Sequence, residues 1–93
     1  LAFHDINPAA PVHVLVIPKG AYVTFDHFAA QASAEEIVDF HRTCAQVCQM
    51  TGVMPGKGYR AITNAAEHGM QEVPHYHLHI LGGRPMGRLV DPA

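Results

Sequence analysis

Histidines alternate with apolar residues near the end of the chain. The segment 75–80 reads His-Tyr-His-Leu-His-Ile, and the pair Gly82-Gly83 follows shortly after it. Such an alternation has the period of a β-strand, in which successive side chains point to opposite faces. The segment 71–84 is therefore predicted to contain a strand with one apolar face and one face that carries three imidazoles.

The apolar pattern predicts three further strands. Residues 1–6 read as a strand, and the two prolines within 7–11 form a turn after it. Residues 12–17 are largely β-branched and almost wholly apolar, which predicts a central strand paired antiparallel with the first. Residues 59–63 read as another strand, and 64–70 form a turn toward the histidine segment.

A helix is predicted between these pairs of strands. Ser33 and Glu36 have the spacing of a capping box. Apolar residues then recur at helical intervals, at Ile37, Phe40, Cys44, Val47 and Cys48. We expect this helix to end near Gly52, and we leave 22–32 open as a short helix or an irregular connection. Two strands, a helix and two more strands predict an α+β fold with a small antiparallel sheet, formed as a single domain by residues 1–93.

Composition narrows the class of function. The chain has 93 residues, a net charge of −2 and six Lys and Arg residues, so it offers no basic surface for a nucleic-acid polymer. No apolar run approaches the roughly 20 residues of a membrane span, and no signal peptide is visible. We expect a cytoplasmic protein, although a longer precursor would hide a targeting segment. Because a small domain buries only about 60–65% of its unfolded surface, we expect an oligomer.

The cysteines suggest no metal or redox chemistry. Cys44 and Cys48 lie four residues apart and would share one face of the predicted helix. We expect them to be reduced and to pack as small apolar groups. A metal pair or a redox couple is the alternative, but neither a C-x-x-C spacing nor a second pair supports it.

A row of imidazoles suits a phosphate-bearing ligand. Same-face residues on a strand lie roughly 6.6 Å apart, so the Cα atoms of His75 and His79 should be about 13 Å apart. One imidazole can then act as a nucleophile while its neighbours donate hydrogen bonds to phosphate oxygens or to a leaving group. A metal ion shared by His77 and His79 is the alternative, but the row offers no obvious third ligand at zinc spacing. We expect neither a metal nor a cofactor.

The string 75–81 resembles the signature of the histidine triad family. The flanking segments 71–74 and 81–84 resemble its nucleotide-binding branch more than its fragile-histidine-triad or uridylyltransferase branches. The resemblance implies a small antiparallel sheet with one principal helix, a homodimer, and an N-terminal segment that this sequence lacks. It also implies a hydrolase that cleaves purine nucleoside 5′-phosphoramidates, and acyl-adenylates, through a covalent nucleotidyl-histidine.

The resemblance assigns roles to four histidines. His77 would be the nucleophile, and His79 would donate to a phosphate oxygen or to the leaving group. His75, supported by His13, would orient the row and relay protons. Without the resemblance, a lone histidine such as His13 in an apolar strand reads more simply as a satisfied core residue.

The resemblance also implies a nucleotide pocket. Asp5 would accept hydrogen bonds from the ribose hydroxyls, although an acidic residue before Asn-Pro can equally cap a turn. Asn64 would contact the phosphate region. The implied substrate-binding residues are Phe3, His4, Asp5, Ile6, Asn64, Met70, Gln71, Glu72, His77 and His79.

Three features depart from the family pattern. Met70 stands where a glycine is usual, and Glu72 stands where animal members often carry a serine. Glu72 would then present its backbone amide or bind a basic leaving group. The C-terminal stretch 88–93 lacks the tryptophan ending of animal members, so the leaving group stays open. Two other functions also stay open: a nucleotide-binding regulatory module with negligible turnover, and a dinucleoside polyphosphate hydrolase.

Overall fold

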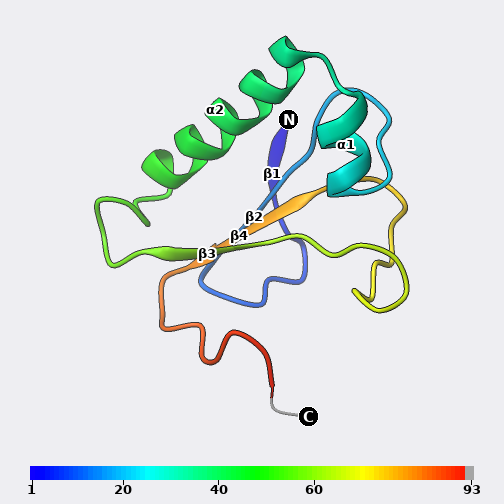
Figure 1. The fold of residues 1–93 in the computed structure, drawn as a ribbon. Helices are drawn as coiled ribbons and strands as arrows, with labels where there is room; N and C mark the ends of the chain where they lie inside the picture. The colour runs from blue at the N-terminus through cyan, green and yellow to red at the C-terminus, as the bar shows by residue number, and fades with distance from the viewer. Residues whose placement is uncertain (92–93) are drawn as a thin grey trace.

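One antiparallel sheet organises the chain. The computed structural model describes residues 1–91, so the last two residues of the stretch 88–93 lie outside the described part. The strands are β1 (Ala2–His4), β2 (Val12–Val16), β3 (Tyr59–Ile62) and β4 (Leu78–Gly82), and their order in the sheet is β1-β2-β4-β3 (Figure 1). All neighbouring strands are antiparallel. With two helices, α1 (Phe25–Gln31) and α2 (Ala34–Met50), the α+β prediction is confirmed.

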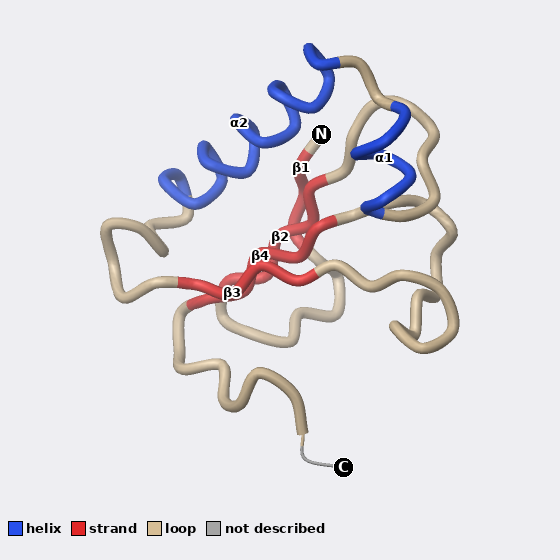
Figure 2. Tube along the Cα trace, in the orientation of Figure 1, coloured by secondary structure: helices blue, strands red, loops and turns tan. Residues whose placement is uncertain are grey.

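The register of β2 and β4 divides the sheet into an apolar face and a polar face. Val14 pairs with Ile80, and Leu15 pairs with His79. Directly paired residues share a face, and successive residues alternate between faces. Val14 and Ile80 are buried in the core, and α2 runs along this side of the sheet (Figure 2). His79 therefore lies on the side away from α2, where the core does not enclose it.

Helix α2 begins as the sequence predicts, but only half of the capping box forms. The Ser33 side-chain oxygen accepts a hydrogen bond from the Glu36 amide at 3.1 Å. The Glu36 carboxylate instead accepts hydrogen bonds from the Gly20 amide and the Tyr22 hydroxyl, each at 2.8 Å. Glu36 thus fastens the start of α2 to the loop that follows β2.

Cys44, farther along the helix, is a free thiol, and burial raises its pKa to about 11.

The segment left open in the sequence forms α1. Its N-cap is Thr24, whose hydroxyl accepts a hydrogen bond from the His27 amide at 3.4 Å. Phe28 of α1 is almost fully buried and lies 5.2 Å from the ring of Tyr76, measured between centroids. Phe40 of α2 packs against the same pair at 5.1 and 5.2 Å. This aromatic cluster fixes the backbone of Tyr76, next to the central histidine.

All four strands are shorter than predicted, and the first strand and the histidine strand differ most from the prediction. The first spans Ala2–His4 rather than 1–6, and it lies at an edge of the sheet with all three residues exposed. The histidine strand begins only at Leu78, so His75 and His77 precede it. Its partner β2 ends at Val16, shortly before Pro18, which has no N–H with which to continue a ladder. The three histidines therefore do not form one regular row.

The helices of the described chain do not match a membrane span. Neither α1 nor α2 is long and apolar enough to cross a bilayer.

Candidate active site

A cavity of about 320 Å³ opens on the polar face of the sheet. Leu15 of β2 and His79 of β4 form its floor, Asp5 reaches it from the end of β1, and the rest of its wall comes from the connection between β3 and β4. The residues that line it are Asp5, Leu15, Asn64, Met70, Gln71, Glu72, Val73, His77 and His79. Seven of these were expected from the sequence, and the apolar pair Leu15 and Val73 was not.

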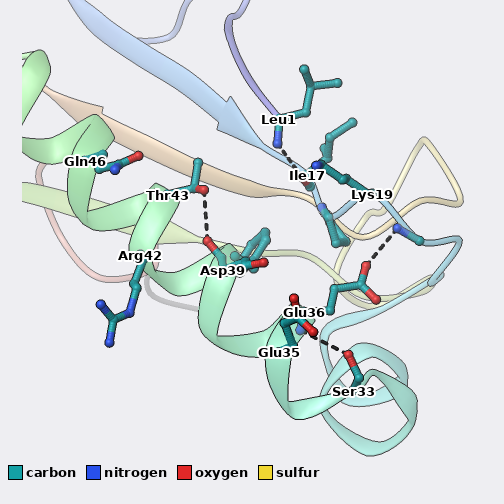
Figure 3. Close-up of a pocket in the computed structure, with 13 residues that line it drawn as sticks. Leu1, Ile17, Lys19, Ser33, Glu35, Glu36, Asp39, Arg42, Thr43 and Gln46 are labelled. Carbon is teal, nitrogen blue, oxygen red and sulfur yellow. Dashed lines mark hydrogen bonds between the residues drawn. The ribbon is translucent and has the colours of Figure 1, made fainter.

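Two larger hollows lie elsewhere and contain none of the triad histidines. One, of about 700 Å³, lies beside α2 and is lined by residues such as Lys19, Glu35 and Asp39 (Figure 3). The other, of about 690 Å³, lies between Lys57 and Arg84 near the C-terminal stretch. Size alone would favour these hollows. Of the three, the smaller cavity is the one lined by imidazoles, which can attack phosphorus as neutral nucleophiles, so we place the chemistry there.

The backbone fixes the tautomer of His77. Its Nδ1 atom lies 2.8 Å from the carbonyl oxygen of His75. A carbonyl oxygen can only accept, so Nδ1 of His77 carries the proton and donates it. In the neutral ring, Nε2 then holds a free lone pair. That is the form an imidazole needs in order to act as a nucleophile.

A second chain of hydrogen bonds fixes the opposite tautomer in His79. The backbone amide of Ala9 donates to Nδ1 of His13 at 3.0 Å, so the proton of neutral His13 is on Nε2. That Nε2–H faces Nδ1 of His79 at 2.8 Å. Nδ1 of His79 therefore accepts, and the proton of neutral His79 is on Nε2. The two histidines in the cavity thus offer complementary atoms, a lone pair on His77 and an N–H on His79, on rings whose centroids are 4.9 Å apart.

The surroundings of His79 keep it neutral. Burial lowers its pKa below the ordinary value of 6.5, and the nearby imidazoles of His77 and His13 lower this pKa further, while Asp5 opposes them. A neutral His79 still donates a hydrogen bond through Nε2–H. Unlike the protonated ring, it is too weak an acid to transfer that proton to His77. The hydrogen bonds therefore set the tautomers of the two rings, and the lowered pKa of His79 favours the neutral form of that ring.

The His75 side chain does not lie where the role expected of it would require. The expected support from His13 goes to His79 instead, because both ring nitrogens of His13 are engaged by Ala9 and His79. The His75 side chain does not line the cavity, and its buried Nε2 has no hydrogen-bond partner among the described residues. What His75 contributes is its carbonyl oxygen, which holds His77.

The four residues 3–6, all expected to bind substrate, do not all lie on the cavity side of the sheet. Asp5 lines the cavity, and its two oxygens have different neighbours. One accepts from the Asn7 amide at 2.7 Å, as a turn cap does, and the other lies 3.6 Å from Nε2 of His13. Phe3 pairs with Leu15 and so shares the face of the cavity. His4 pairs with Val14 on the opposite face, and Ile6 is 93% exposed, so neither of them lines the cavity.

Gln71 has a structural role in this structure. Its side-chain amide donates to the carbonyls of Val23 and Val73, at 2.6 and 3.0 Å, and its oxygen accepts from the Ala66 amide at 3.0 Å. These bonds tie the connection between β3 and β4 to itself and to the connection between β2 and α1, and they use the polar atoms expected to bind substrate. Asn64 differs, because its side-chain amide has no hydrogen-bond partner in the described chain and remains available to a ligand.

Asp5, His13 and His79 could also be considered as metal ligands. One ligand atom from each lies within 4.8 Å of the others. However, the two imidazole nitrogens of this group form a hydrogen bond with each other, and the ring centroids lie 5.1 Å apart. A metal would have to displace the shared proton and turn both rings. These residues are therefore better arranged to share a hydrogen bond than to coordinate a metal ion.

Comparison with known proteins identifies the family. The family model described as the HIT domain matches residues 1–86, and the chain belongs to this family. An uncharacterized 13.2 kDa HIT-like protein of Azospirillum brasilense is 49% identical over 97% of this chain and 73% of its own length. The purine nucleoside phosphoramidase of Escherichia coli strain K12 is 38% identical over 96% of this chain and 73% of its own length.

Solved structures agree with this assignment. The HIT family hydrolase from Clostridium thermocellum has a TM-score of 0.83 and 42% identity, with coverage of 96% of this chain and 76% of that one. The HIT family hydrolase from Legionella pneumophila has a TM-score of 0.81 and 38% identity, with coverage of 92% and 75%. The family membership expected from the histidine string is confirmed, and it supports hydrolase activity.

Proposed function

We propose that the protein hydrolyses the P–N bond of purine nucleoside 5′-phosphoramidates, and of related acyl-adenylates at their P–O bond, through a nucleotidyl-His77 intermediate. The observation that carries this proposal is the pair of opposite tautomers at His77 and His79. A lone pair and an N–H directed into one cavity are what attack on phosphorus requires. The similarity to a purine nucleoside phosphoramidase supports the choice of bond.

The reaction takes two displacements. Nε2 of His77 attacks the α-phosphorus, the bond from phosphorus to the leaving nitrogen breaks, and that nitrogen departs as an amine after taking a proton from solvent. Nε2–H of His79 donates to a phosphate oxygen or to the leaving nitrogen and stabilises the charge that develops there. The His75 carbonyl stabilises the cationic ring of the adduct through Nδ1–H. A water oxygen then attacks phosphorus, the bond from phosphorus to Nε2 of His77 breaks, the water gives up a proton to solvent, and the nucleoside monophosphate leaves the neutral His77 ring.

The charges of the cavity favour this substrate over a dinucleoside polyphosphate. Asp5 and Glu72 contribute carboxylates to the wall, and among the described residues that line it there is no Lys or Arg. A polyphosphate leaving group would bring further negative charge with no cation to meet it. The volume of about 320 Å³ is also at the lower end for small-molecule sites. A small amine leaving group suits both the absence of cationic side chains from the described lining and the small volume of the cavity.

In the proposed reaction the nucleoside binds at the edge of the sheet. We propose that Asp5 accepts hydrogen bonds from the ribose hydroxyls and that the free amide of Asn64 binds the phosphate.

We also propose that the protein acts as a homodimer, because a chain this small leaves apolar residues such as Val38 and Tyr59 about half exposed. Light scattering of the purified protein tests the dimer.

The experiment that tests the function uses radiolabelled adenosine 5′-phosphoramidate. We expect turnover to adenosine monophosphate and a labelled protein after quenching in alkaline denaturant, because acid would hydrolyse the P–N bond of a nucleotidyl-histidine. His77→Ala should abolish both, while it leaves binding of adenosine monophosphate measurable by calorimetry. His68→Ala is the matched control, because His68 is exposed and does not line the cavity. Nucleotide binding without turnover by the wild-type protein would instead establish the regulatory-module alternative.

A further inference from the structure

Met70 has an unusual backbone conformation at the mouth of the cavity. Its φ is +57°, in the left-handed region that glycine adopts without cost. The turn around it has the hydrogen bonds of a Schellman motif: the Gln71 amide donates to the Ala66 carbonyl at 3.0 Å, and the Met70 amide donates to the Glu67 carbonyl at 3.0 Å. Met70 occupies the position of that motif where glycine is usual.

These bonds hold the Met70 backbone in place. A third bond supports the same turn, because the side-chain oxygen of Gln71 accepts from the Ala66 amide. A glycine at position 70 would complete the turn with less strain, so the fold does not require a methionine here. Strained residues that the fold does not require are often found at functional sites.

The position of Met70 suggests what its side chain does. Met70 lines the cavity, yet 79% of its surface is exposed, and Val73 beside it is 58% exposed. No part of the described core covers these two apolar side chains. A bound molecule that covers them would gain the free energy of removing apolar surface from water.

The two ends of a substrate can be assigned to opposite walls. Asp5 follows β1 at one edge of the sheet, whereas the segment 70–73 belongs to the connection between β3, at the other edge, and β4. The reactive atoms of His77 and His79 belong to the same cavity as both walls. With the ribose at Asp5 and phosphorus at His77, the leaving group extends toward Met70 and Val73.

We propose that Met70 and Val73 form a leaving-group subsite that prefers amines with an aromatic or branched aliphatic substituent. The inference rests on the proposed phosphoramidase activity and adds the class of amine. The competing influence is the exposed carboxylate of Glu72 in the same wall, which would favour a cationic amine.

The test compares kcat/KM for three adenosine 5′-phosphoramidates: unsubstituted, N-benzyl, and N-(4-aminobutyl). We expect the wild-type protein to prefer the N-benzyl compound about tenfold over each of the others, as burial of a modest apolar area allows. In Met70→Gly this ratio should approach one. Because glycine relieves the positive φ, the melting temperature should rise by about 4 °C, which separates lost selectivity from lost folding.

Met50→Ala is the matched control. Met50 is 86% exposed at the end of α2 and does not line the cavity, so the ratio should keep its wild-type value. A wild-type preference for the aminobutyl compound, or a benzyl preference that survives in Met70→Gly, overturns the subsite while leaving the proposed activity in place. Absence of turnover and of a labelled adduct with all three compounds overturns both.

Discussion

Nε2 of His13 lies 2.8 Å from Nδ1 of His79, and the backbone amide of Ala9 engages the other nitrogen of His13. This chain of bonds turns the outward nitrogen of His79 into a donor. His13 does not line the cavity, so we propose that it acts as a positioning residue. Its effect on the reaction depends on which tautomer His79 adopts.

His13→Phe is therefore expected to impair catalysis more than binding. Without the N–H of His13, neutral His79 can place its proton on either nitrogen, and its donor is lost from the cavity part of the time. Because the donor is lost only part of the time, we expect kcat for adenosine 5′-phosphoramidate to fall by about two- to tenfold, less than if a proton-donating group were removed outright, with KM changed much less. Steady-state kinetics measure both constants.

The conservative variant separates tautomer control from packing. His13→Gln keeps an N–H that can face His79, so part of the lost kcat should return. If the Phe variant retained wild-type kcat while it remained folded by circular dichroism, the assigned role of His13 would be wrong.

Acid should destabilise the folded protein through His79. In the unfolded chain this residue takes up a proton as the pH falls through its ordinary pKa of 6.5, whereas in the folded protein burial holds its pKa lower. The unfolded state therefore binds more protons in the window just below 6.5, and the free energy of unfolding decreases as the pH falls. Urea titrations at about pH 7 and pH 5 measure this change.

Replacing His79 isolates its share of the pH effect. His79→Gln should show a smaller loss of stability between the two pH values than the wild-type protein, and His68→Gln should not. An equal loss in the wild-type and His79→Gln proteins would show that other groups cause the acid sensitivity.

Glu36→Ala should reduce stability more than Glu35→Ala. Both residues are in the first turn of α2, so both substitutions lose a similar interaction with the helix dipole. Only the Glu36 carboxylate accepts the bonds from Gly20 and Tyr22. We expect Glu36→Ala to lower the free energy of unfolding by about 2 kcal/mol, given two hydrogen bonds to a partly exposed charged group, and Glu35→Ala by less than about 1 kcal/mol. Equal values in chemical denaturation would contradict this account.

Arg60 should hold the C-terminal stretch in place. Its guanidinium donates to the carbonyls of Met86, Gly87 and Arg88, at 3.2, 2.7 and 2.9 Å. A lysine cannot reproduce this fork, so Arg60→Lys is expected to lower the free energy of unfolding by about 1 to 2 kcal/mol. It should also speed proteolysis after residue 85, which mass spectrometry can follow.

Arg42→Lys serves as the control for the Arg60 variant. Arg42 is exposed on α2, far along the chain from the C-terminal stretch. Its substitution should leave the proteolysis rate unchanged. If Arg60→Lys were also digested at the wild-type rate, the three hydrogen bonds would not restrain this stretch in solution.

The sequence determined the elements that depend on local pattern. The alternation of Tyr76 and Ile80 with the histidines predicted their burial, and both are at most 2% exposed. The spacing from Ile37 to Cys48 and the Ser33 cap predicted α2. The histidine string also predicted the family. These features follow from side-chain type and spacing, because hydrophobic burial and helix capping depend directly on both.

Only the tertiary structure decided which nitrogen of each histidine faces the cavity. The deciding partners are the His75 carbonyl and the Ala9 amide. Every residue type but proline carries both of these backbone groups. The identity of residues 9 and 75 therefore could not have predicted these hydrogen bonds. The same holds for the partner of His13, since the register of β2 against β4 brings it to His79 instead of His75. The sequence could indicate an imidazole site, but long-range backbone contacts determine where its protons lie.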